Sequence, residues 1–221
     1  MYDRSLCLYA GAVTQDGRLI RGERTRTAVL DRALPLATVA GLDGLSLSQV
    51  AEALAVSKSG LFAHWRSKEA LQLAVIEHAR RQFVDQVIRP ALRAPRGVRR
   101  LWAVHDARLA FYEAEVLPGG CFFANANFEF NARPGAVRDR LAEGFTAWMS
   151  MLTRLASEAI AEGEMNDVDP EQLAYEIEAL GLTAVMQVRL LRDTGYSYSR
   201  QAVLDRLRSL CPDPTLLPEE P

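Results

Sequence analysis

The sequence predicts an all-α protein of about nine helices, with a small N-terminal three-helix unit followed by a larger helical domain. Two observations predict this class. Apolar residues recur three and four positions apart through most of the 221 residues, which is the period of an amphipathic helix. Most Gly and Pro residues stand between these periodic segments and therefore indicate loops.

Composition fits a globular protein, with 49% hydrophobic and 24% charged residues and a net charge of −2. No apolar run approaches the roughly 18 residues that a membrane span needs. The N-terminal residues lack the layout of a signal peptide, so we expect a cytoplasmic protein. Cys7, Cys121 and Cys211 are odd in number and far apart, which argues against a disulfide framework.

The first helix is expected over residues 24–40, with Gly41 ending it. Pro35 lies inside this segment, where it removes one backbone N–H and clashes with the carbonyl four residues earlier. We therefore expect a kink between Asp31 and Pro35. Residues 1–20 carry no clear period and are expected to form a flexible arm.

Two short helical patterns with a tight turn between them follow at residues 45–71. Ser46 and Gln49 have the spacing of a capping box, and the first helix has its apolar face at Leu47, Val50, Ala51 and Leu54. Ser57 can cap a second helix over residues 58–65, with Leu61, Phe62 and Trp65 facing inward. Helices joined by so short a turn must cross steeply, as in a helix-turn-helix.

The outer side of this second helix suits a nucleic acid. Its first turn, Ser57-Lys58-Ser59-Gly60, has only small or cationic side chains, and the free N–H groups at a helix N-terminus favour phosphate. Lys58 and Lys68, the only lysines of the chain, flank the helix. Residues 18–68 hold eight basic and four acidic residues, so this segment is positive while the rest of the chain is acidic.

The residues quoted so far resemble the DNA-binding motif of the TetR family of transcriptional regulators. The resemblance rests on Ser46, Val50, Ala51, Val56, Ser57, Leu61, Phe62, His64, Trp65, Ser67, Lys68, Glu69 and Leu71, with a first helix in register upstream. It covers about 50 residues. Ala55 stands where the family usually has Gly, and Phe62 where it usually has Tyr, which puts affinity in doubt.

The resemblance implies double-stranded DNA as partner, a small-molecule effector, and dimerisation through the last two helices. Combined with the residue pattern, it gives the following candidate DNA-binding residues: Arg24, Ser46, Leu47, Ser57, Lys58, Ser59, Gly60, Phe62, His64, Trp65 and Lys68. Residues 21–66 would form the DNA-binding domain.

Residues 67–211 are expected to form the ligand-binding and dimerisation domain, and residues 212–221 a disordered tail. Helices are predicted over 67–89, ended by Pro90, and over 98–116, 121–131, 134–163, 169–194 and 199–210, with Gly195 ending the fifth. The fifth helix is apolar nearly all round, at Tyr175, Leu182, Val185, Met186 and Leu190 among others. A second copy of the chain would cover such a helix.

Candidate effector-binding residues are mostly aromatic or sulfur-containing and suggest a hydrophobic or planar small molecule. They are Trp102, His105, Tyr112, Phe123, Asn127, Phe128, Phe145, Trp148, Met149, Met186 and Arg189. Two interpretations of the Phe- and Asn-rich segment 121–131 stay open: a pocket wall, or a plain amphipathic helix. Cys121 is interpreted as a small apolar residue in preference to a redox-sensing thiol.

No catalytic or metal-binding motif is present, and no cofactor is expected. The sequence therefore predicts a non-enzymatic DNA-binding regulator, a repressor that binds a palindromic operator as a homodimer and is released by a small hydrophobic effector. The alternative is an all-helical small-molecule-binding protein or enzyme without DNA-binding activity.

Overall fold

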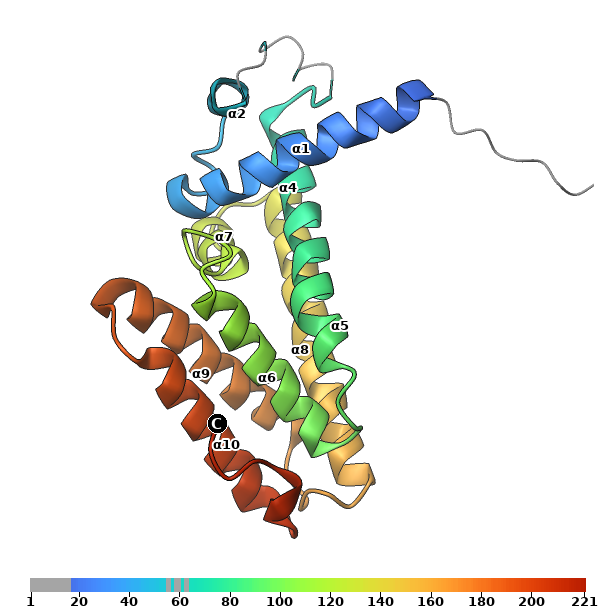
Figure 1. The fold of residues 1–221 in the computed structure, drawn as a ribbon, viewed down its shortest axis with the longest axis vertical. Helices are drawn as coiled ribbons and strands as arrows, with labels where there is room; N and C mark the ends of the chain where they lie inside the picture. The colour runs from blue at the N-terminus through green and yellow to red at the C-terminus, as the bar shows by residue number, and fades with distance from the viewer. Residues whose placement is uncertain (1–16, 55–56, 58–60, 62–63) are drawn as a thin grey trace, which may run out of the picture.

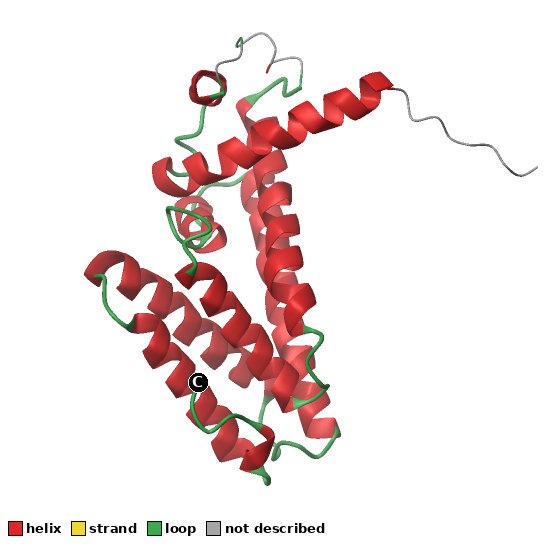
Figure 2. Cartoon of the chain, viewed as in Figure 1, coloured by secondary structure: helices red, strands yellow, loops and turns green. Residues whose placement is uncertain are grey.

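The computed structural model describes residues 17–54, 57, 61 and 64–221, with side chains from Thr25 onward. Within these ranges all regular structure is helical, which confirms the predicted class (Figure 2). The helices are α1 (Gly17–Ala40), α2 (Leu47–Ala53), α4 (Lys68–Phe83), α5 (Arg89–Ala91), α6 (Val98–Glu113), α7 (Phe122–Phe130), α8 (Ala136–Ala161), α9 (Pro170–Leu191) and α10 (Gly195–Leu210). None of the described helices is long and apolar enough to cross a membrane.

We call residues 17–66 the head and residues 67–221 the body. Helices α4 and α8 run side by side along the long axis of the molecule, and α1 crosses the upper end of α4 (Figure 1). The short helix α7 lies beneath α1 and also contacts α8. Helices α6, α9 and α10 pack together in the lower part of the body. Helix α4 and helix α7 are thus the body elements next to the head.

One hydrophobic core passes from the head into the body. It joins head residues such as Leu34, Leu61 and Trp65 to Phe122 and Phe130 of α7. A second core fills the lower body between α6, α8, α9 and α10. Close packing transmits displacement, so the head cannot shift without a response from the upper body.

Helix α1 is longer than the sequence pattern predicted. It begins at Gly17 instead of Arg24, so residues 17–20 are helical and do not belong to a flexible arm. Residues 1–16 lie outside the described residues. The helix continues through Pro35 to Ala40, and the Thr38 hydroxyl donates to the Pro35 carbonyl over 2.8 Å.

The prediction that Pro90 ends the helix after Ser67 was wrong. The chain remains helical to Ala91 because a single π-helical turn, Val84–Ile88, joins α4 to α5. In this turn the Arg89 N–H donates to the Val84 carbonyl, five residues earlier. The wider turn directly precedes Pro90, whose ring would meet the carbonyl four residues back in a regular α-helix.

Gly195 was also misassigned, since it begins α10 and does not end α9. Helix α9 ends at Leu191, and Arg192 takes the left-handed conformation with φ of 55°. The Asp193 carboxylate accepts the Gly195 N–H over 3.0 Å and so fixes the start of the last helix. Any Cβ at Gly195 would lie 3.1 Å from Val188.

The C-terminal tail is ordered, contrary to the expectation of disorder. Residues Pro214–Leu216 form a 3₁₀ turn, which the Asp213 carboxylate caps by accepting the Thr215 N–H. Arg208 donates to the carbonyls of Pro218 and Glu219. Leu217 is 4% exposed and belongs to the lower core. Leu216 also packs against this core, so two neighbouring apolar side chains hold the Pro-containing tail in place.

We expect Leu217→Ala to lower the free energy of unfolding by roughly 2–4 kcal/mol, as buried leucine truncations do. Urea denaturation followed by circular dichroism measures the change. Glu220→Ala, at an exposed position of the same tail, is the control and should leave stability unchanged. Equal midpoints for Leu217→Ala and the unmodified protein would show that the tail does not pack.

Candidate functional site

The first helix of the helix-turn-helix is capped as predicted. The Ser46 side chain accepts the Gln49 N–H over 3.2 Å, and the Gln49 side chain accepts the Ser46 N–H over 2.9 Å. Both partners of the capping box are therefore in place, which fixes the start of α2. Leu47, Val50 and Ala51 are buried beneath it.

The second helix is described only in part. The Leu61 N–H donates to the Ser57 carbonyl, and the Trp65 N–H donates to the Leu61 carbonyl. Lys58, Ser59, Gly60 and Phe62, together with Ala55, lie outside the described residues, and so does the side chain of Arg24. Their predicted roles at DNA stay predictions.

Leu47 and Trp65 were wrongly placed among the DNA-contacting residues. Leu47 is 7% exposed and Trp65 is 1% exposed, so both belong to the core. The Arg26 guanidinium lies 4.9 Å from the centre of the Trp65 ring, and His64 packs against the same ring at 5.6 Å. Trp65 therefore supports the reading helix from within and cannot meet a base edge.

Lys68 begins α4 at the boundary of the head. A lysine at a helix N-terminus opposes the helix dipole, so an anion beside its ammonium offsets the unfavourable charge. The structure supplies one internally: the Lys68 ammonium lies 2.8 Å from the Asp43 carboxylate, which also pairs with Arg133 at 2.7 Å. Hydrogen bonds from Lys68 and then Arg133 hold the pKa of Asp43 below its ordinary value.

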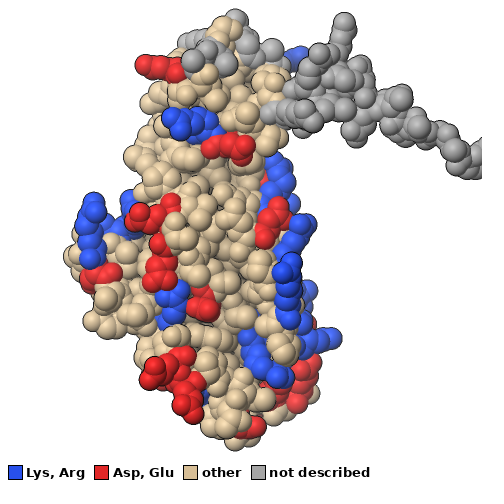
Figure 3. Space-filling view, viewed as in Figure 1, with Lys and Arg blue, Asp and Glu red and all other residues tan. Residues whose placement is uncertain are grey.

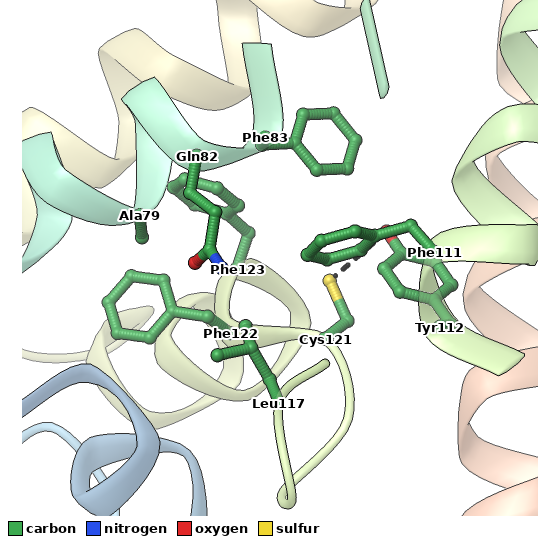
Figure 4. Close-up of a pocket in the computed structure, with 9 residues that line it drawn as sticks. All are labelled: Ala79, Gln82, Phe83, Phe111, Tyr112, Leu117, Cys121, Phe122 and Phe123. Carbon is green, nitrogen blue, oxygen red and sulfur yellow. Dashed lines mark hydrogen bonds between the residues drawn. The ribbon is translucent and has the colours of Figure 1, made fainter. Parts of the chain in front are cut away.

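A cavity lies between α4, α6 and α7 and the turn before α7 (Figure 4). Its interior volume is about 10 Å³, which is room for about one water molecule. A ligand of ordinary size would therefore have to widen the cavity by displacing the side chains that line it. The lining residues are Ala79, Gln82, Phe83, Phe111, Tyr112, Leu117, Cys121, Phe122 and Phe123. Its wall is therefore mostly aromatic, as expected for a hydrophobic or planar ligand.

Three polar groups face this cavity. The Cys121 thiol donates to the Tyr112 hydroxyl over 3.2 Å, and burial raises the pKa of both groups above their ordinary values. Both are therefore uncharged at neutral pH, which favours the interpretation of Cys121 as a small apolar residue. The Gln82 amide extends among the phenylalanine rings (Figure 4). It has no hydrogen-bond partner among the described residues.

The structure brings together only part of the predicted effector-binding set. Tyr112 and Phe123 line the cavity, and Trp148 adjoins it through a ring contact with Phe83 at 5.7 Å. Trp102, His105 and Met149 pack inside the body and do not line the cavity. Asn127, Phe128, Phe145, Met186 and Arg189 do not line the cavity, and Phe128, Phe145 and Met186 are largely exposed.

The contribution of α4 to the cavity was not predicted from the sequence. Ala79, Gln82 and Phe83 follow one another at helical spacing and face α7. A usable signal was present, because Gln82 is a polar residue next to the apolar stripe of that helix. The relative rotation of α4 and α7 places Gln82 among the phenylalanines. This rotation depends on tertiary packing, so the hydrophobic periodicity of the sequence does not reveal it.

His105 belongs to a buried polar network beside the cavity. Arg108, 3% exposed, donates to the Glu178 carboxylate over 2.5 Å and to His105 Nδ1 over 3.2 Å. Because a guanidinium only donates, His105 carries its proton on Nε2 and donates it to Ser199 Oγ. Trp148 Nε1 donates to the same Glu178 oxygen over 2.8 Å.

Close approach between α6 and α9 makes this network possible. A Cβ at Gly181 would lie 1.9 Å from Arg108 Nη2, so only glycine leaves room for the guanidinium at that position of α9. Arg108 Nε has no acceptor among the described residues. The charges of Arg108 and Glu178 balance, so the buried network is neutral overall.

These features define a class of protein: a helix-turn-helix head fused through a shared core to a helical body with a small aromatic-lined cavity. Two family models match the chain. "Bacterial regulatory proteins, tetR family" matches residues 29–75, and "Tetracyclin repressor-like, C-terminal domain" matches residues 97–203. The chain belongs to the TetR family of DNA-binding transcriptional regulators, which removes the alternative of an enzyme.

Individual relatives agree with this assignment. The HTH-type transcriptional regulator RutR of Escherichia coli strain K12 is 28% identical over 173 residues, which cover 76% of this chain and 78% of RutR. A TetR transcriptional regulator from Chloroflexus aurantiacus has a TM-score of 0.81 at 26% identity, over 87% of this chain and 98% of that one. AibR, solved with isovaleryl coenzyme A and operator DNA, has a TM-score of 0.64 at 21% identity, over 85% and 98%.

We expect His105 to make stability depend on pH. Burial, with Arg108 adding to it, lowers the pKa of His105 well below its ordinary 6.5, so the unfolded chain takes up a proton that the folded chain refuses. Stability from this source is complete above pH 6.5 and falls as pH decreases below it, by about 1 kcal/mol near pH 5.5. Urea denaturation near pH 7.5 and near pH 5.5 measures it. The loss should be smaller in His105→Gln, and an equal loss in both proteins would contradict the assignment.

Proposed function

We propose that the protein is a repressor that binds a palindromic operator as a homodimer and that a small, neutral, mostly apolar effector releases it. The observation that carries the proposal is the core shared between the head and the cavity-bearing upper body. An effector that binds at the cavity and DNA that binds the head therefore both contact the same packed unit. We propose repression, and not activation, of transcription because most members of the family are repressors.

The DNA side of the proposal rests on the head. In a helix-turn-helix the N-terminal part of the second helix meets base edges, which here is Ser57-Lys58-Ser59-Gly60. Lys68 at the start of α4 would bind a DNA phosphate. Its ammonium would either keep its ion pair with the Asp43 carboxylate or exchange that pair for the phosphate. On the face drawn in Figure 3 positive and negative side chains are interspersed over the body. The body therefore offers no single positive surface on that face to compete for DNA.

The dimer side of the proposal rests on exposed apolar residues of the last two helices. Tyr175, Met186 and Leu190 are 64%, 53% and 74% exposed and fall on one side of α9. Tyr198 of α10 is 63% exposed. Exposed apolar side chains gathered in this way mark an interaction surface. A two-fold dimer would place two reading helices one DNA turn, roughly 34 Å, apart.

The effector side of the proposal rests on the charge balance around the cavity. Cys121 and Tyr112 are uncharged, His105 is neutral, and Arg108 is already paired with Glu178. An ionised effector would bring an unbalanced charge into this setting, at a cost of several kcal/mol. A neutral molecule with an apolar ring or chain and one hydrogen-bonding group for Gln82 fits better. To release a repressor that nearly saturates its operator, the effector must bind the form with weak DNA affinity about 10⁴-fold more tightly than the form with strong DNA affinity.

We expect Lys68→Ala to weaken binding to all duplexes alike, because a phosphate contact carries no sequence information. The slope of log affinity against log salt should fall by about one. Fluorescence anisotropy over a salt series measures both quantities. Lys58→Ala is the contrasting variant, and it should change the preferred sequence by roughly 1–3 kcal/mol per affected base pair. An unchanged slope in Lys68→Ala would remove Lys68 from the phosphate contacts.

We expect Leu190→Arg to convert the dimer into a monomer, because it places a charge in the centre of the proposed apolar interface. Sedimentation velocity measures the mass, and circular dichroism confirms that the helices remain. Phe145→Arg on α8 is a matched control, since Phe145 is also exposed, at 44%, but lies on another helix. A Leu190→Arg variant that still sediments as a dimer would exclude this face as the interface.

A further inference from the structure

The connector between α1 and α2 is held by a carboxylate from the body. The backbone N–H of Leu42 donates to Glu129 Oε2 over 2.7 Å, and the N–H of Asp43 donates to Glu129 Oε1 over 2.9 Å. Glu129 lies near the end of α7, far away in sequence. Hydrogen bonds to an ionised acceptor are about twice as strong as neutral ones, so this is a firm contact. We call it the Glu129 clamp.

The backbone of the connector is shaped to fit the clamp. Gly41 has φ of +81°, a conformation that residues other than glycine rarely adopt, and a Cβ there would come within 2.8 Å of Glu129 Oε1. The carbonyl of Leu42 accepts a hydrogen bond from the Gln72 side chain of α4 over 3.0 Å. Leu42, 1% exposed, therefore joins the two body helices that border the head.

A second contact ties the end of α1 to the start of α7. The Gly119 N–H donates to the Thr38 hydroxyl over 3.0 Å, and the Asn125 side chain donates to the Thr38 carbonyl over 3.3 Å. A Cβ at Gly119 would lie 1.9 Å from that carbonyl, so glycine is needed for this approach. The head thus meets α7 at two separate points.

The same helix forms one wall of the cavity. Phe122 and Phe123, in the first turn of α7, line it together with the N-cap residue Cys121 (Figure 4). Glu129 follows two helical turns later, roughly 10 Å along the axis. A helix of this length moves as one piece, so a ligand that displaces Phe122 or Phe123 also displaces Glu129 and Asn125.

We propose that Glu129 is a positioning residue for the DNA-reading head and that α7 carries changes in the cavity to the head, by a route separate from α4. The clamp acts on the connector that precedes α2, whereas α4 acts on the segment that follows the reading helix. The inference rests on the proposed function, because DNA binding is its readout.

A double-mutant cycle tests the route without knowledge of the effector. Phe123→Ala empties part of the cavity wall, and Glu129→Ala removes the clamp. The DNA is a duplex selected from a random pool for binding to the unmodified protein. We expect each change alone to weaken binding to this duplex at least fivefold. The double variant should bind no more than twofold more weakly than Glu129→Ala alone, because contacting networks are not additive. Glu129→Gln keeps one acceptor and should bind between the unmodified protein and Glu129→Ala.

Controls separate positioning from general destabilisation. Glu143→Ala on α8 removes an exposed carboxylate that pairs with Arg140, and its effect should add to that of Phe123→Ala. Amide hydrogen exchange of Leu42 and Asp43 should quicken in Glu129→Ala while the amides of α9 and α10 keep their protection. If Phe123→Ala does not fold, Phe123→Leu replaces it in the same cycle.

The outcomes distinguish the inference from the proposed function. Absence of DNA binding by the unmodified protein contradicts the proposed function itself. Binding by the unmodified protein, with the effects of Phe123→Ala and Glu129→Ala adding independently or with Phe123→Ala without effect, overturns the route through α7. Protection of Leu42 and Asp43 that does not change in Glu129→Ala overturns the clamp.

Discussion

The apolar core that joins the head to the upper body is the constraint on which the rest of the structure depends. Trp65 and Leu61 of the reading segment belong to the same packed cluster as Phe122 and Phe130 of α7. A head with its own closed core would move as an independent unit. Here its orientation is set by the body, and the Glu129 clamp adds directional hydrogen bonds to packing that by itself has no direction.

The body combines an aromatic cavity with a neutral polar network, and the two have different roles. The cavity residues Phe83, Phe111 and Phe123 provide apolar area, while the Arg108–Glu178 pair joins α6 to α9 next to it. Buried pairs of this kind cost desolvation energy and are often retained for the geometry they impose. Because α9 also carries the exposed apolar residues, the cavity, the proposed dimer surface and the head are connected through few helices.

Much of the fold was predictable because it depends on local sequence signals. Ser46 with Gln49 predicted a helix start that the structure contains, and the helix expected from residue 169 has Asp169 as its N-cap. The errors arose where tertiary contacts decide: Leu217 orders the tail, and the π turn carries the chain past Pro90. The sequence predicted the aromatic character of the cavity wall, but of its lining residues it predicted only Tyr112 and Phe123. Gln82 and Phe83 reach the cavity because of the rotation of α4 against α7. Glu129 lies in the Phe- and Asn-rich segment 121–131, but its partners Leu42 and Asp43 depend on the docking of α7 against α1.

Selection of bound duplexes from a random DNA pool by the purified protein tests the central claim most directly. The account predicts a palindromic motif with half-sites one helical turn apart, read by a dimer. Recovery of no motif while salt-sensitive binding persists would mean that the head contacts only phosphates, and would direct attention to Ala55 and Phe62. Absence of binding at low salt would contradict the account, and the function would then have to lie in the cavity of the body.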